Sequence, residues 1–329
     1  MRLFIRRFCL LLPLALWLAG ETAAQPSVIA VDTGREIHIN HRLTQGPVRP
    51  VTIPITIRWR DKNNQSELLD LSRLQVLEDN EAQEVVSIRA VGTSDPLYLT
   101  ILIQDDIISS IGNELGALKE FIQRLPTGSK VMIGYLRGGS LQVRQKFTNE
   151  LDKAAKALRI TTGQAGSAPF NPYVQVLEAL KKYDAQPKGR RALLLVSDGV
   201  DISRGLSDAS PGQSLDLQRA VDSAQRRSVA VYSIYSPTSA VAGSGSSFLV
   251  NNGQGSLNRL SDETGGRAYF QGTGAPVSFD PFLKEVALLF RSQLALTYLS
   301  THLKKGFHRI KVIPGSRELT IEHPAGYSR

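Results

Sequence analysis

Cysteine is almost absent from this chain. The one cysteine, Cys9, lies within the first 25 of 329 residues. If that N-terminal segment is removed, the remaining chain has no disulfide, no thiolate metal site and no cysteine nucleophile. A protein without disulfides depends on its apolar core for stability, so we expect a domain of substantial size.

Several sequence motifs of catalysis and nucleotide binding are also missing. The chain contains no GxSxG, HExxH, Walker or GxGxxG element. None of its five histidines is close in sequence to Asp105 or Asp198, two acidic residues that follow apolar runs. We therefore expect that the protein is not an enzyme.

The chain is basic, but its positive charge is scattered. Lysine and arginine total 39 against 30 acidic residues, a formal net charge of +9. The clusters are short, as at Lys188–Arg191 and Lys304–Lys305, and no aromatic residues are interleaved with them. A nucleic-acid-binding protein usually gathers such residues on one surface, so we expect no nucleic-acid partner and only weak attraction to anionic surfaces.

The N-terminal sequence predicts export. Residues 1–24 combine a basic start, a short apolar stretch at Phe8–Ala19 and small residues before a cleavage point after Ala24, which is typical of a signal peptide. The apolar stretch is shorter than the roughly 20 residues that a membrane span needs. We expect a periplasmic or extracellular protein without stable membrane insertion. An uncleaved anchor is the alternative.

The rest of the sequence divides into three segments. Residues 25–95 show β patterns, including a period-two alternation at 51–61, and residues 294–329 return to a β pattern. Between them, in 96–293, apolar runs alternate with amphipathic helical patterns. The fold class predicted is α/β, with a doubly wound, mostly parallel sheet and a small accessory β domain built from both ends of the chain.

One internal segment looks structureless. Residues 236–255 are rich in glycine and serine. This composition predicts a long loop near one rim of the sheet.

Two apolar runs end in carboxylates. The run Leu97–Ile103 is followed by Asp105 and Asp106, and a second run reaches Asp198. Ligands of open α/β sheets bind at the carboxyl ends of strands, so these carboxylates meet in one crevice if the strands are neighbours. Hard oxygen ligands of this kind suit Mg²⁺ or Ca²⁺.

The same residues have simpler interpretations. Ser109 and Ser110, which follow the first acidic pair, favour the N-cap position of the next helix. Asp198 and Gly199 form a common turn pair. Only the coincidence of both strand ends favours a site over capping and turns.

The two strand ends resemble those of a known family. "LTILIQDDIISS" and "LLLVSDG" resemble the first and fourth strand ends of a von Willebrand factor A domain. The order of a β segment, this domain and a C-terminal "GFHRIKV" strand with a final "GY" is similar to exported von Willebrand factor A-related proteins abundant in Acidobacteria. The resemblance implies a protein-binding module with a metal-ion-dependent adhesion site.

That site, in the family, is built from Asp-x-Ser-x-Ser, a loop threonine and a later Asp-Gly. The resemblance implies a metal site formed by Asp105, Ser109, Ser167 and Asp198, with Thr161 or Thr162 as alternatives to Ser167. Ile107 occupies the middle serine position and has no oxygen to give. A water molecule on Mg²⁺ or Ca²⁺ replaces it in the metal-binding hypothesis, and the alternative is a vestigial site.

Three functions follow from these patterns. The first is an exported module that binds a protein partner, with a degenerate metal site. The second is a metal-independent scaffold or assembly protein. The third, least favoured by the sequence, is a hydrolase that uses Asp105 and Asp198.

Overall fold

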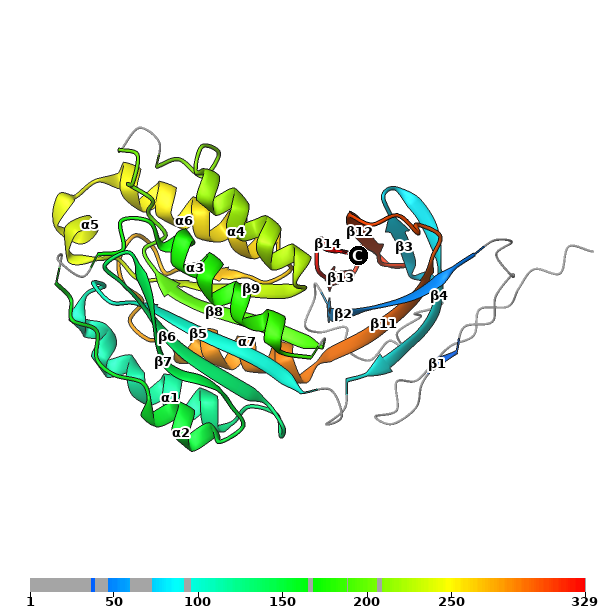
Figure 1. The fold of residues 1–329 in the computed structure, drawn as a ribbon, viewed down its shortest axis with the longest axis horizontal. Helices are drawn as coiled ribbons and strands as arrows, with labels where there is room; N and C mark the ends of the chain where they lie inside the picture. Colours follow the sequence, from blue (N-terminus) through cyan, green and yellow to red (C-terminus); the bar gives the residue numbers. More distant parts are fainter. Residues whose placement is uncertain are drawn as a thin grey trace, which may run out of the picture.

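The computed structural model describes residues 37–38, 47–59, 73–91, 96–164, 168–187, 189–205 and 209–328. The predicted signal peptide lies outside these residues. The described chain forms two parts, each built on its own β-sheet (Figure 1). No helix within the described ranges is both long and apolar enough to cross a membrane.

The first part contains a six-stranded sheet with the strand order β10-β9-β8-β5-β6-β7. All neighbouring strands run parallel except the edge pair β6 and β7, which is antiparallel. The strands are β5 (Leu97–Gln104), β6 (Lys130–Arg137), β7 (Ser140–Thr148), β8 (Arg190–Ser197), β9 (Val229–Tyr235) and β10 (Ala268–Tyr269). The apolar runs that end in aspartate are therefore the adjacent central strands β5 and β8.

Helices cover both faces of this sheet because its central strands are apolar on both sides. Ile101 and its odd-numbered neighbours in β5 pack in one core, and Leu102 packs in the other. The first core is completed by α1 (Leu115–Gln123), α2 (Leu151–Lys156) and α7 (Asp280–Arg291). The second is completed by α3 (Pro172–Lys181), α4 (Leu215–Arg226) and α6 (Ser247–Asp262).

The predicted loop at 236–255 is wrong, because this segment is largely helical. Helix α5 (Ser239–Ser244) begins after Thr238, whose side chain accepts a hydrogen bond from the Val241 N–H. Ser246 caps α6 in the same way. The left-handed conformation of Gly245, with φ of 59°, separates the two helices. The hydroxyls and glycines that suggested a loop are used here as helix caps.

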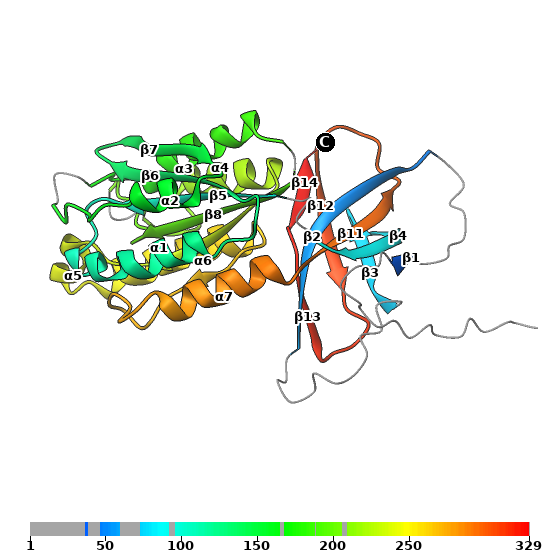
Figure 2. The ribbon, with the colours of Figure 1, turned by 90° about the horizontal axis from the view of Figure 1, so that it is seen from below.

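The second part is an antiparallel sheet that takes strands from both ends of the described chain. Its strand order is β13-β2-β11-β4-β3-β12-β14, with β1 also paired to β4. The strand that follows α7, β11, lies between the two early strands β2 and β4 (Figure 2). The bounds are β1 (Ile37–His38), β2 (Arg49–Trp59), β3 (Gln75–Glu78), β4 (Glu81–Ala90), β11 (Gln293–Ser300), β12 (Phe307–Ile313), β13 (Leu319–Glu322) and β14 (Gly326–Ser328).

The predicted fold class is therefore wrong. The antiparallel sheet is curled and has eight strands, which makes it larger than the six-stranded mixed sheet rather than a small accessory domain (Figure 1). The short β patterns near the two ends of the chain gave no measure of how many strands combine in one sheet. Pairing across more than 200 residues, as between Thr56 and Gln293, decides that number.

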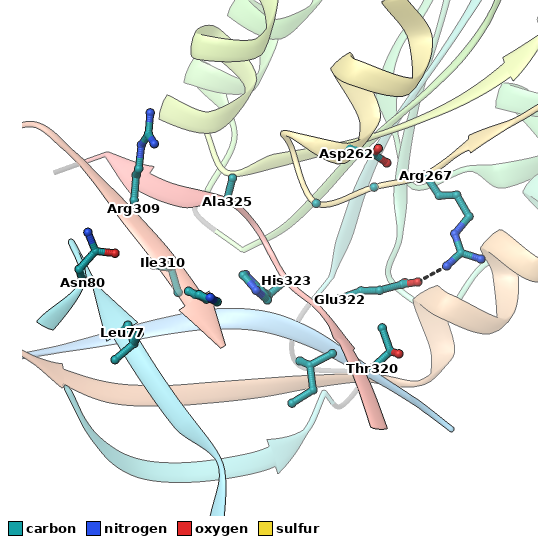
Figure 3. A pocket seen from close by; sticks show the side chains of 14 residues that line it. Leu77, Asn80, Asp262, Arg267, Arg309, Ile310, Thr320, Glu322, His323 and Ala325 are labelled. Atoms are coloured by element: carbon teal, nitrogen blue, oxygen red, sulfur yellow. Dashed lines mark hydrogen bonds and ion pairs between the residues drawn. The ribbon is translucent and has the colours of Figure 1, made fainter. Parts of the chain in front are cut away.

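The two parts meet tightly at Gly265, in the turn after α6. A Cβ atom added there would lie 2.7 Å from the His323 carbonyl oxygen and 2.8 Å from Pro324 Cα. Beside this contact, Arg267 forms ion pairs with Glu285 of α7 and Glu322 of β13. A cavity of about 530 Å³ lies next to this joint. Figure 3 shows the side chains that line it, with Glu322 reaching toward Arg267.

We expect Gly265→Ala to destabilise the protein. The backbone of Gly265 has φ of 81°, which favours glycine, and the added methyl meets backbone atoms that cannot move independently. A loss of about 2 kcal/mol or more in the free energy of unfolding follows from strain and overpacking together. Denaturant unfolding measures it. Gly212→Ala is the control, since nothing lies within 4 Å of its added Cβ; equal stability of the two variants would contradict the tight joint.

Candidate functional site

Three aspartates are buried in the turns at the carboxyl ends of β5 and β8. Ile103 of β5 is aligned with Val196 of β8, so Asp105 and Asp198 follow at the same edge of the sheet. Asp105 is fully buried, and Asp106 and Asp198 are each 4% exposed. Because buried carboxylates need hydrogen bonds or opposite charges, the partners of each one decide what this edge can do.

Asp105 is held by an arginine that the sequence reasoning missed. Arg159 reaches it with two parallel hydrogen bonds, of 2.6 Å to Oδ1 and 2.9 Å to Oδ2. The Arg159 guanidinium lies 4.1 Å from the centre of the Tyr135 ring, and the Tyr135 hydroxyl donates to the Arg159 carbonyl at 2.8 Å. The hydrogen bonds to Asp105 raise the pKa of Arg159. Both oxygens of Asp105 therefore face a permanent cation.

Nothing in the sequence pointed to this pair. Arg159 is separated from Asp105 by 54 residues and belongs to no motif. The loop after α2 brings it back across Tyr135 of β6, which lies beside β5 in the sheet. The ion pair between Arg159 and Asp105 therefore depends on β6 lying next to β5 in the sheet.

Asp106 and Asp198 are instead joined to each other through Gln104. The Gln104 Nε2 atom donates to Asp106 Oδ1 at 2.9 Å, and its Oε1 atom accepts from the Asp198 N–H at 3.3 Å and from the Ser197 hydroxyl. Asp198 Oδ1 also accepts a hydrogen bond from the Val200 N–H at 3.0 Å. The carboxylate pair of this site is thus Asp106 and Asp198, rather than Asp105 and Asp198.

The electrostatics of this pair favour a proton or a cation. Burial, with a smaller contribution from the charge of Asp106, raises the pKa of Asp198 to about 7 against hydrogen bonds that act in the other direction. Burial, and then the charge of Asp105, raise the pKa of Asp106 against its hydrogen bond from Gln104. Two like charges in a buried site oppose each other's ionisation.

A tyrosine hydroxyl beside the pair is unsatisfied. Tyr235 is fully buried, and its hydroxyl has no hydrogen-bond partner among the residues that the structure describes. Burial and the charge of Asp198 raise its pKa to about 12. A buried hydroxyl without a partner is uncommon and indicates an absent water, ion or ligand group.

Only two of the four predicted metal ligands have side chains among the described residues. Asp105 and Asp198 lie at neighbouring strand ends, but Asp105 is bound by Arg159. The Ser109 side chain and the whole of Ser167 lie outside the described residues. The metal site composed of these four residues stays a prediction.

The alternative threonines have structural roles. Thr162 Oγ1 donates to the Asp105 carbonyl oxygen at 2.9 Å, and Thr161 Oγ1 donates to the Ile107 carbonyl oxygen at 3.3 Å. Ile107, at the position where the family has a serine, is fully buried in the first core. These three residues fasten the turn after β5 to the neighbouring loop.

Four exposed apolar side chains lie on segments that adjoin the carboxylates: Arg159 beside Ile160 binds Asp105, and α6 packs against Asp198 at Gly253. Ile160 follows Arg159 directly, Phe170 precedes α3, Ile202 follows β8, and Phe248 lies in the first turn of α6. Phe170 and Ile160 are each 60% exposed, Phe248 50% and Ile202 37%. The Ile202 N–H donates to the Phe170 carbonyl oxygen at 2.9 Å, which ties two of these loops together. We call these four residues the apolar rim.

Comparison with known proteins gives structural likeness alone. No protein-family model matches the chain, and no curated protein matches it. Solved structures that resemble it share only about a tenth of its residues. One of them is a von Willebrand factor type A protein. That protein, from Catenulispora acidiphila, is 11% identical with a TM-score of 0.41, and the match covers 88% of this chain and 76% of that chain.

Two other similar structures come from Bacteroides species. The conserved hypothetical protein BatB from Bacteroides thetaiotaomicron is 12% identical, with a TM-score of 0.42 and coverage of 59% of this chain and 96% of that chain. An aerotolerance-related membrane protein from Bacteroides fragilis is 10% identical, with a TM-score of 0.39 and coverage of 59% and 98%. The family that the sequence resembles is thus represented among similar structures, whereas the link to Acidobacteria stays a prediction.

We expect Asp198 to make the protein less stable as the pH rises. Its pKa is about 7 in the folded state against 3.8 for the free group, so the folded state keeps a proton that the unfolded state releases. The free energy of unfolding should fall between about pH 4 and pH 7, by an amount on the order of 4 kcal/mol if no cation is bound. Asp198→Asn removes this slope and is more stable than the wild type at pH 8.

Denaturant unfolding at several pH values measures this difference. Asp152→Asn, which removes the same charge from an exposed side chain, is the control and should keep the wild-type slope. A wild type and an Asp198→Asn variant with parallel pH profiles would show that Asp198 ionises normally.

We expect Arg159→Met to destabilise the protein, because it leaves the buried charge of Asp105 with only the longer ion pair to Arg137, 3.6 Å from Oδ2. Removing one member of a buried ion pair costs about 3–5 kcal/mol in the free energy of unfolding. Asp105→Asn in the same chain should recover part of this loss, because it removes a charge that Arg137 alone compensates incompletely. Arg144→Met, at an exposed position of β7, is the control. If the double variant is no more stable than Arg159→Met, the pairing does not explain the loss.

Proposed function

We propose that this chain is an exported protein-binding module of the von Willebrand factor A type, which contacts its partner through the apolar rim. The observation that carries the proposal is that four exposed apolar side chains lie on segments that adjoin a buried carboxylate pair. Exposed apolar residues are ordinary when they occur singly. Two phenylalanines and two isoleucines on segments beside one polar site are the composition of a binding surface, with large side chains as anchors.

Phe170 supports the proposal most directly. Its φ of 56° is uncommon for a bulky residue and carries backbone strain. Its side chain is exposed and gains little packing in return. Strain without a local gain in packing is typical of functional positions, and burial against a partner would supply the missing contacts.

A divalent cation at the pair is the second candidate. Asp106, Asp198 and the Thr238 hydroxyl, which hydrogen-bonds to Asp198, are hard oxygen donors that fit Mg²⁺ or Ca²⁺. The unsatisfied Tyr235 hydroxyl favours a ligand group at this place. A partner carboxylate would complete the coordination of such an ion. If no ion binds, a lysine or arginine side chain of the partner would supply the positive charge that Asp106 and Asp198 lack.

The proposal assigns no reaction to the site. Nucleophilic catalysis by Asp105 needs a carboxylate oxygen that can reach a substrate. Both of its oxygens accept hydrogen bonds from Arg159, and its side chain is fully buried. The protein acts in this proposal by binding alone, as an adhesion module or as a metal-independent scaffold.

We expect a photo-crosslinking amino acid at position 170 to capture a partner protein in the exported fraction. The same group at Leu288, which is 62% exposed on α7, is the control and should not capture it. The captured protein is then purified, and its affinity is measured by calorimetry for the wild type and for Phe170→Ser. Loss of an interface anchor should weaken binding at least tenfold.

The same titrations with Mg²⁺, Ca²⁺ or EDTA separate the two candidates. Binding that needs the ion and disappears in Asp198→Asn supports the cation. Binding that EDTA leaves unchanged supports the metal-independent surface. Equal capture from positions 170 and 288, or undiminished binding by Phe170→Ser, would rule out the apolar rim.

A further inference from the structure

A groove lined by arginines lies between the two parts of the structure. Its volume is about 540 Å³, and it runs along β2 on one side and along the start of β8 and the end of α4 on the other. We call it the arginine groove; its arginines are Arg49, Arg89, Arg190, Arg191, Arg226 and Arg227. No aspartate or glutamate is among the described residues that line it.

The charge of Arg191 is only weakly compensated. Its guanidinium donates to the backbone carbonyls of Gln186, at 2.6 Å, and Arg227, at 3.0 Å, which are neutral acceptors. Its Nε atom is buried and has no hydrogen-bond partner in the described part of the chain. Burial lowers the pKa of Arg191, and the charge of Arg227 adds to this effect, while Tyr183 and the charge of Asp184 act against it. Arg227 itself is paired with Asp184 through two hydrogen bonds of 2.8 Å.

Arg49 and Arg226 add positive charge that is open to solvent. Arg49 begins β2 and Arg226 ends α4, and both side chains are exposed. Neither side chain forms an ion pair or hydrogen bond with a residue that the structure describes. The groove therefore concentrates several cations between low-dielectric walls, which strengthens their attraction for an anion.

The wall formed by the antiparallel sheet contributes apolar surface. Pro50, Pro54 and Ala295 line it, together with Val91 and with Pro324 from the C-terminal segment. Arg49 of β2 and Arg89 of β4 add cations to this same wall. Cations on both walls, together with apolar carbon, match a ligand that has a charged head and an apolar body.

The two prolines of β2 exclude one class of occupant. The outer edge of β2 pairs with β13 only at Thr56–Trp59, which leaves residues 49–55 unpaired on that side among the described strands. Pro50 and Pro54 have no N–H, so two of the outward positions of this segment cannot donate a hydrogen bond. A peptide strand could not extend the sheet here, whereas a small molecule needs no such ladder.

We propose that the arginine groove binds a small organic anion, consisting of a phosphate or carboxylate group on an apolar body. Arginine binds both groups through paired hydrogen bonds, and the volume lies within the range of about 300–1,000 Å³ that is usual for small-molecule sites. The site is separate from the apolar rim. Arg190, in the groove, begins β8, and Ser197, next to the carboxylates, ends it. The length of the strand therefore places the two surfaces about 25 Å apart, at opposite ends of the strands.

Calorimetric titration of the full mature chain tests the proposal with octyl phosphate and octanoate below their micelle concentrations. Both contain the required head and body, and the stronger binder identifies the preferred head. Inorganic phosphate and octyltrimethylammonium are the comparison ligands. We expect tighter binding of the octyl anions than of inorganic phosphate, no binding of the octyl cation, and weaker binding as salt rises.

The test variant is Arg49→Gln combined with Arg226→Gln, which changes two exposed side chains and leaves the folded core untouched. We expect roughly tenfold weaker binding, since an exposed charge contact contributes up to about 1 kcal/mol. The matched control is Arg144→Gln with Lys146→Gln, which removes two exposed charges from β7, away from the groove. Its affinity should stay within about twofold of the wild type.

Four results would overturn the proposal. They are no binding of either octyl anion, equal binding of octyltrimethylammonium, equal binding of inorganic phosphate, and an equal loss of affinity in the control variant. Vesicles that contain an anionic phospholipid form a separate arm. Binding to such vesicles without binding to the soluble octyl anions would indicate a membrane surface instead of a small-molecule site.

Discussion

The burial of β5 and β8 on both faces is the constraint from which the other features follow. Helices cover these strands on both sides, so the residues directly after the strands are also buried. Here those residues are Asp105, Asp106 and Asp198. Removing a carboxylate from water costs several kcal/mol unless charge or hydrogen bonds offset it. The chain offsets this cost in two different ways, and the difference defines the candidate site.

Asp105 is neutralised within the chain, whereas Asp106 and Asp198 are not. Arg159 supplies Asp105 with a full positive charge and two hydrogen bonds. Asp106 accepts a hydrogen bond from Gln104, and Asp198 accepts one from the Val200 N–H. These donors are neutral, and burial raises the pKa of both carboxyls against them. The pair is thereby left in need of a proton, a metal ion or a cationic side chain. An edge of this kind, with exposed apolar residues on the adjoining segments, is suited to binding a partner that brings the missing charge.

The two ends of the six-stranded sheet have opposite electrostatic character. The carboxyl edge holds the carboxylate pair, and the amino end of β8 faces the arginine groove. The groove exists only because the antiparallel sheet is held against the first part, through Gly265 and the ion pairs of Arg267. The joint between the parts thus shapes a surface that neither part has alone.

Local patterns in the sequence determined the two central strands and the aspartates at their ends. The apolar run at Leu97–Ile103 became β5, and the helical spacing after it became α1. Tertiary structure alone decided the pairing of Arg159 with Asp105, the choice of Asp106 as partner of Asp198, and the insertion of β11 between β2 and β4. The reason is physical: side-chain periodicity is a property of neighbouring residues, whereas strand order and buried charge pairing join residues that are far apart along the chain.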